Sequence, residues 1–234
     1  MNEERAFDEE LKDLKAKVLE MATRAEEQIA RAVLSLKERK RELACEVLEK
    51  EKAINVLDIE IDEMAMRLLA LRQPMATDLR FITSAMRIET DLERIGDLAV
   101  NIAERSLELI KYPQLKPLID IPRMAELAQG MVRDAINAFI RGDDKLAQNV
   151  CERDDQVDDL CDQVFRELLT YMMQDPSTIN RAVDLILVAR HLERIADLAT
   201  NIGEDVIYVI RGKTIKHHIE EGIKPPHPSC TEKE

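Results

Sequence analysis

Three oxygen-bearing side chains, two carboxylates and one amide, recur twice in this sequence at a spacing of four residues. They are Glu93, Asp97 and Asn101 and, one hundred residues later, Glu193, Asp197 and Asn201. Side chains four residues apart share one face of a helix, so each set forms a row of oxygen ligands. Such ligands suit a hard cation, Mg²⁺, Mn²⁺, Ca²⁺ or Fe, and no thiolate or imidazole cluster indicates zinc. The pattern predicts one metal site in each half, and such a metal could in turn hold a phosphate.

The residues around each row are repeated as well. Segments 91–104 and 191–204 are identical at ten of fourteen positions. Their apolar residues alternate by three and four, which packing explains, but packing does not explain the polar row. If the apolar residues form the seam, the polar row points away from the bundle interior. A small residue, Gly96 or Ala196, then leaves room above the carboxylates. The alternative without function is a solvated helix face.

Further acids stand beside the apolar seams of the preceding helices, namely Glu51, Asp58, Asp154 and Asp158. They could approach the two rows and complete the metal sites. Acids in this position more often form the solvated edge of a core, so they are weaker candidates.

The elements that position these residues are helices. Aromatic residues make up 3% of the 234 residues, Trp is absent, and an apolar three-four rhythm runs through the chain without strand alternation. Prolines and charged turns divide the rhythm into six expected helices, at about 7–36, 47–71, 74–109, 121–140, 150–174 and 176–209. The prediction is an all-α fold of two tandem antiparallel three-helix bundles. The first spans 1–112, the second 113–218, and a disordered tail spans 219–234.

Composition excludes several classes of protein. A formal charge of −13 repels nucleic acid. No run of 18 apolar residues could span a membrane, and the acidic N-terminus lacks the apolar core of a signal peptide, so we expect a cytoplasmic protein without membrane insertion. The cysteines lack Cys-x-x-Cys spacing, which predicts free thiols at Cys45, Cys151, Cys161 and Cys230.

Three stretches together resemble the PhoU family over about residues 5–218. They are Gln73-Pro-Met-Ala-Thr-Asp-Leu-Arg80, Leu92-Glu-Arg-Ile-Gly-Asp97 with Asn101-Ile102, and the second copy Leu192-Glu-Arg-Ile-Ala-Asp197. The second half departs from the first in having Asp175-Pro-Ser-Thr178, with no Asp-Leu-Arg after it.

The resemblance implies two three-helix bundles with multinuclear metal clusters on their Glu/Asp-x-x-x-Asp faces. By position, the ligand pairs are Glu93 with Asp97 and Glu193 with Asp197, and Asn101 and Asn201 follow as additional ligands. It also implies a signalling adaptor that negatively regulates the phosphate regulon. The implied partners are the ATPase of the phosphate ABC transporter (PstB-type), a sensor histidine kinase (PhoR-type) and a second copy in a homodimer.

Two rival functions remain. A di-iron enzyme needs Glu-x-x-His pairs directed into a bundle core, and none of the four histidines has Glu three residues before it. We therefore expect no catalysis. A metal-binding helical scaffold without a regulatory role is the other rival. The tail residues His217, His218, His227 and Cys230 could also bind metal, but tail histidines are more often incidental.

Overall fold

The computed structural model describes residues 2–212, with side chains from residue 6 onward. Within this range every regular element is a helix, and no strand occurs. The predicted all-α fold of two three-helix bundles is confirmed. The tail 219–234, with its predicted disorder and its candidate ligands, and residues 213–218 lie outside the described residues.

The first bundle consists of α1 (Asn2–Glu38), α2 (Arg41–Arg72) and α3 (Ala76–Ile110). The breaks fall where charge and proline predict them. Arg39 has a φ of 57° between α1 and α2, and Gln73 has a φ of 47° at the end of α2. Because Pro74 follows, the chain cannot continue the helix and turns back into α3.

The second bundle consists of α4 (Asp120–Arg141), α5 (Asp144–Glu152), α6 (Asp154–Gln174), a 3₁₀ turn η1 (Pro176–Thr178) and α7 (Ile179–Arg211). Gly142 supplies the left-handed turn after α4 with a φ of 67°. Asp143 then caps α5 by accepting backbone hydrogen bonds from Lys145 and Leu146 at 3.1 and 3.0 Å.

The prediction of one continuous fifth helix is wrong, because the chain turns at Arg153 between α5 and α6. The Arg153 N–H donates to the Val150 carbonyl at 3.1 Å, which tightens the last turn of α5. Its guanidinium donates to Asp134 of α4 at 2.7 Å. A tertiary contact therefore holds the break, and no glycine or proline marks it in the sequence.

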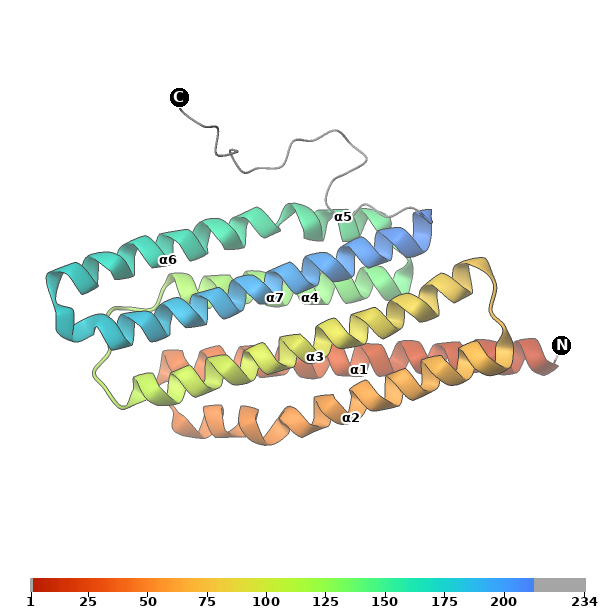
Figure 1. Cartoon of the computed structure of the whole chain (residues 1–234), viewed down its shortest axis with the longest axis horizontal. Coiled ribbons are helices and arrows are strands. Elements are labelled where there is room, and N and C mark those ends of the chain that lie inside the picture. Colours follow the sequence, from red (N-terminus) through yellow and green to blue (C-terminus); the bar gives the residue numbers. More distant parts are fainter. Residues whose placement is uncertain (1, 213–234) are drawn as a thin grey trace, which may run out of the picture.

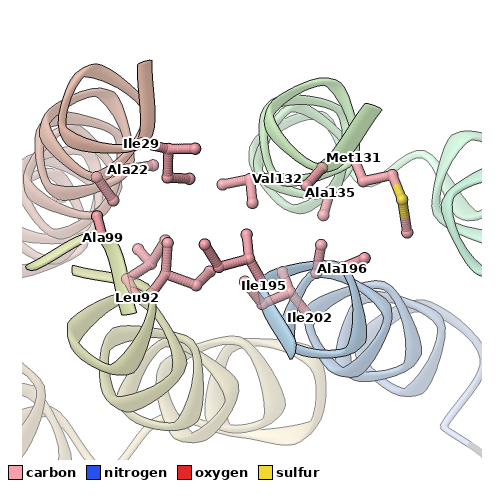
Figure 2. Packing of buried hydrophobic residues seen from close by; sticks show 14 of the residues in the cluster. Ala22, Ile29, Leu92, Ala99, Met131, Val132, Ala135, Ile195, Ala196 and Ile202 are labelled. Carbon is pink, nitrogen blue, oxygen red and sulfur yellow. The ribbon is translucent and has the colours of Figure 1, made fainter. Parts of the chain in front are cut away.

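The two bundles lie side by side and share one continuous core. Helices α3 and α7 run antiparallel next to one another (Figure 1), joined near their two ends by the ion pairs Arg87–Asp205 at 3.2 Å and Arg105–Asp184 at 3.3 Å. Residues from α1, α3, α4 and α7 meet in the middle, among them Ile29, Leu92, Val132 and Ile195 (Figure 2). The predicted seams of α3 and α7 are buried throughout.

The linker between the bundles is fixed to both of them. Arg39 donates to the carbonyl oxygens of Ile110 and Tyr112. The buried Lys116 forms an ion pair with Glu167 of α6.

Among the described residues no helix is long and apolar enough to cross a membrane. Cys45, Cys151 and Cys161 are free thiols, as predicted.

Candidate metal centres

The predicted row on α3 lies at the edge where α3 packs against α2. Asp97 is exposed, as expected, whereas Glu93 and Asn101 are half-buried. The expectation that the whole row points to solvent is therefore only partly right. Burial raises the pKa of Glu93, and the nearby carboxylates of Asp97, Asp58 and Glu51 raise it further. The structure thus gathers the two weaker candidates of α2, Glu51 and Asp58, around the row on α3.

Two acids join this first cluster that were not predicted. Asp62 follows Asp58 by one turn of α2, and together with burial it raises the pKa of Asp58. Glu89 precedes Glu93 by one turn of α3 and is 5% exposed. Burial raises the pKa of Glu89 to about 8, and the charges of Asp58 and Asp62 contribute. Its Oε2 is buried without a hydrogen-bond partner. Glu89 is thus a protonated acid at neutral pH beside the ionisable carboxyls of Asp58 and Asp62.

The second cluster lies at the equivalent edge of the second bundle, where α7 packs against α6. Glu193 is half-buried, while Asp197 and Asn201 are exposed. Burial and the charge of Glu193 raise the pKa of Asp197. Burial likewise raises the pKa of Asp158, with contributions from Asp197 and Glu193.

Asp154 is the most perturbed acid of the second cluster. Burial raises its pKa to about 7, with contributions from Asp197, Asp158 and Glu193. Its Oδ1 is buried and has no hydrogen-bond partner. Asp154 is the first residue of α6, so the unpredicted break at Arg153 places it there.

The two clusters follow the internal repeat. Asp58 and Asp62 correspond to Asp158 and Asp162 at the same offset of one hundred residues that relates the rows on α3 and α7. This second repeated Asp-x-x-x-Asp pair was the signal that could have revealed Asp62 and Asp162. The most buried acids break the symmetry, since Glu89 corresponds to Ala189 and Asp154 to Ile54.

Gly96 does not leave room above the carboxylates, so that expectation is wrong. A Cβ added at Gly96 would lie 3.0 Å from Cδ1 of Ile54 on α2. The glycine therefore permits close packing of α2 against α3, and Ala196 is likewise fully buried. Close packing of the helices, and not empty space, brings the acids of the first cluster together.

One arginine distinguishes the second cluster from the first. Arg190 donates two hydrogen bonds to the carboxylate of Glu193, at 2.9 and 3.0 Å. Thr90 stands at the equivalent position of the first half. A cation that uses both oxygens of Glu193 must displace Arg190.

The residues fit a hard cation in their chemistry. The candidate ligands of each cluster are carboxyl and amide oxygens, and each cluster includes a buried, unpartnered carboxyl oxygen, that of Glu89 or of Asp154. The thiols of Cys151 and Cys161 also lie near the second cluster, and burial raises the pKa of both to about 11, so they stay protonated. Within the part of the chain that the structure describes, however, no three His, Cys, Asp or Glu side chains already converge to hold a metal ion.

Comparison with known proteins identifies the family. The PhoU domain matches residues 18–106 and 121–206. A PhoU homolog of the phosphate-specific transport system from Aquifex aeolicus is 45% identical over 91% of this chain and 96% of its own length. A homolog with the same description from Caulobacter vibrioides is 42% identical over 90% of this chain and 92% of its own length.

Two crystal structures have the same fold. PhoU from Pseudomonas aeruginosa is 40% identical, with a TM-score of 0.85 over 88% of this chain and 100% of that chain. The phosphate transport system regulatory protein PhoU from Streptococcus pneumoniae is 32% identical, with a TM-score of 0.83 over 89% of this chain and 98% of that chain. This chain therefore belongs to the PhoU family.

Proposed function

We propose that this chain is a cytosolic, metal-binding adaptor of phosphate transport. It negatively regulates the phosphate regulon and modulates phosphate uptake by linking the phosphate ABC transporter to the sensor kinase. The relatives are described as accessory proteins of a phosphate-specific transport system, which supports the transport role. The observation that carries the metal role is the pair of related carboxylate clusters, each with a buried unpartnered oxygen.

The cost of assembling these carboxylates supports a bound cation. Like charges on adjacent turns destabilise a helix, and burial destabilises each charge further. Burial raises the pKa values of Glu89 and Asp154 and so favours the neutral forms of both side chains. A cation reverses this preference, because it stabilises the ionised form of its ligands.

The proposed ligands come from two helices in each half. In the first they are Glu93, Asp97 and Asn101 of α3 with Asp58, Asp62 and Glu89. In the second they are Glu193, Asp197 and Asn201 of α7 with Asp154, Asp158 and Asp162. A bound Fe, Mn, Mg or Ca ion supplies positive charge that offsets the acidic faces, so metal loading would alter how the surface meets a partner. No catalytic step is assigned to it.

Asp97 and Asp197, the second acid of each Glu-x-x-x-Asp pair, provide the direct test of metal binding. We expect Asp97→Ala with Asp197→Ala to remove most bound metal from protein purified without chelator, because each cluster loses one exposed ligand. Stability should not fall, because like-charge repulsion is relieved. Asp8→Ala with Asp13→Ala, two exposed acids of α1, is the matched control. Unchanged metal content in the Asp97 and Asp197 variant would refute the site, and a collapsed fold would show that the acids are structural.

The regulatory role is tested in the native host. Deleting the gene should derepress alkaline phosphatase or another phosphate-regulated product in high phosphate, and derepression should require the sensor kinase. The unaltered gene and the Asp8, Asp13 control should restore repression, and the Asp97, Asp197 variant should not. If the deletion strain stays repressed and the purified protein binds neither the ATPase nor the kinase, only the metal-binding scaffold remains.

A further inference from the structure

A shallow depression lies between the two clusters, where α3 and α7 run side by side (Figure 1). Three residue types line it, each supplied once by α3 and once by α7, namely Arg94, Asp97, Leu98, Arg194, Asp197 and Leu198. Helices α3 and α7 are antiparallel, and each of these residues is related to its counterpart by the offset of one hundred. A pseudo-twofold axis therefore passes through the depression.

The two arginines are available to a partner. Arg94 is 61% exposed, and it forms a loose ion pair of 3.6 Å with Asp91 on its own helix. Arg194 is exposed, and its charge acts on the carboxyl of Asp197, one turn along the same helix, where it partly offsets the rise in pKa that burial causes. Across the axis neither arginine forms an ion pair with the other helix. Both guanidiniums can therefore take a new acceptor without breaking a strong contact.

Between the arginines the surface is apolar. Leu98 and Leu198 are partly buried and pack against the shared core, so they form a rigid floor. An apolar centre with charged groups around it is the anatomy of a protein docking site. A free oxyanion fits less well, because it has no apolar group to cover Leu98 and Leu198, whereas a protein partner can supply both an apolar side chain and a charged one.

We propose that this depression docks a protein dimer whose own twofold axis coincides with the pseudo-twofold axis of this chain. Each subunit of the partner places one apolar side chain over Leu98 or Leu198 and one carboxylate beside Arg94 or Arg194. Twofold dimers are the commonest symmetric oligomers, and a chain that presents the same residues twice can contact both subunits alike. The stoichiometry is one copy of this chain per partner dimer. This inference rests on the proposed adaptor function, and it specifies where and how the partner binds.

The test uses the full chain with the transporter ATPase and with the detergent-solubilised sensor kinase from the same organism. Native mass spectrometry should show one chain per dimer of at least one of them. Arg94→Glu and Arg194→Glu should each raise the dissociation constant about tenfold and by similar factors, because the two positions are equivalent. The double variant should lose binding by about a hundredfold.

Controls separate the surface from fold and metal. Arg41→Glu with Arg123→Glu changes two exposed arginines of α2 and α4 by the same charge and should leave binding unchanged. Leu98→Asn with Leu198→Asn tests the apolar floor without a change of charge and should also weaken binding at least tenfold. Melting temperature and metal content are measured for every variant, so that loss of binding is read only from folded, metal-loaded protein.

Several outcomes overturn the proposal. Two chains per dimer, or a large effect of Arg94→Glu with none of Arg194→Glu, contradicts the shared axis. Unchanged affinity in the double variant contradicts this surface but leaves the adaptor function standing. Binding of neither protein by the unsubstituted chain contradicts both. If the substitutions instead abolish a homodimer of this chain, the occupant is a second copy.

Discussion

Glu89 is the acid whose titration is most strongly coupled to folding. Its pKa is raised to about 8 in the folded chain, from 4.5 for a free side chain. Between these values the folded state binds more protons than the unfolded state, so the free energy of unfolding falls as pH rises. Stability from this group is present below about pH 4.5 and is lost as pH rises through about 8. Ionisation of Glu89 should therefore make the free energy of unfolding of chelator-treated protein lower at pH 8 than at pH 5.

Glu89→Gln removes this titration while keeping the shape of the side chain. In chelator-treated protein we expect it to raise the free energy of unfolding at pH 8 by about 1–3 kcal/mol and to change it little at pH 5. Denaturant unfolding at the two pH values measures both effects. Glu104→Gln, at an exposed position of the same helix, is the control and should show no such difference. An equal effect of Glu89→Gln at both pH values would contradict the raised pKa.

Metal binding should release protons from the same acids. The pKa of Glu89 is about 8 and that of Asp154 about 7, so at pH 7 Glu89 is mostly protonated and Asp154 about half protonated, and a cation displaces these protons. Apparent metal affinity should accordingly fall as pH is lowered from 8 to 6. Calorimetric titration in buffers of different ionisation enthalpy counts the protons. The count should drop in Glu89→Gln and in Asp154→Asn, and an unchanged count in both would exclude these residues as proton donors.

At the scale of elements, two glycines set how closely the helices approach. A Cβ at Gly96 would meet the flexible end of Ile54 at 3.0 Å, whereas a Cβ at Gly203 would meet the Ala147 carbonyl oxygen at 3.1 Å and Cys151 Sγ at 3.2 Å. Neither glycine is repeated in the other half, because Ala196 corresponds to Gly96 and Ala103 corresponds to Gly203. Each half therefore has one close helix contact at a different turn.

Substituting these glycines should give unequal results. Alanine favours a helix over glycine by about 1 kcal/mol, which offsets a steric cost that Ile54 can relieve by rotating. Gly96→Ala should thus be nearly neutral. Gly203→Ala presses on the backbone of α5, which cannot rotate away, and should destabilise by about 1–2 kcal/mol net. Thermal and denaturant unfolding measure both, and equal effects would show that the α5–α7 contact yields as readily as a side chain.

The helix ends were largely predictable because local residues determine them. Pro74, Gly142 and Pro176 act through their own backbone geometry, so the turns around them follow from sequence. The break at Arg153 depends on the contact with Asp134 of α4, which no local pattern reveals. Element boundaries that depend on tertiary contacts stay hidden from periodicity.

The candidate site was predictable to the same extent. The rows on α3 and α7 stand out because their types and spacing repeat. Glu89 does not, since its role depends on burial against α2 and on Asp58 and Asp62, and it has no acidic counterpart in the second half. Gly96 was misread for the same reason, because its neighbour Ile54 lies on another helix.

At the scale of the whole molecule, the bundles depend on one another. Leu92, Ile95, Leu192 and Ile195 are fully buried, although within its own bundle α3 packs only against α1 and α2, and α7 against α4 and the broken helix α5–α6. Their remaining surface is covered by the other half, where α1, α3, α4 and α7 meet (Figure 2). The sequence repeat predicted two similar units but not that their seams are wide enough to share a core.

The ion pair between the buried Lys116 of the linker and the partly exposed Glu167 of α6 should be sensitive to loss of the lysine. The Lys116 side chain is 4% exposed and pairs with Glu167 of α6, with Asp120 at 3.8 Å. Lys116→Ala removes the cation that contacts both acids, and because water still reaches Glu167 we expect a loss of about 1–3 kcal/mol in the free energy of unfolding. Lys116→Met, which keeps the packing volume, should cost less. Equal losses would assign the effect to packing instead of charge.

Separating the halves tests the shared core directly. Residues 1–112 and 113–234, expressed as separate chains, each expose the apolar face of α3 or α7 that the other half covers, and a patch of this kind drives association. The central part of the α3 seam, Leu92, Ile95, Ala99 and Ile102, is identical to the corresponding part of the α7 seam. Residues 1–112 alone should therefore form a homodimer in which a second α3 takes the place of α7. Light scattering after size exclusion and circular dichroism should show a helical dimer whose unfolding depends on concentration.

Mixing the halves should restore a one-to-one complex, because the α1–α4 contact and the ion pairs Arg87–Asp205 and Arg105–Asp184 form only between unlike halves. Two stable helical monomers that do not combine would show that each bundle has a sufficient core of its own.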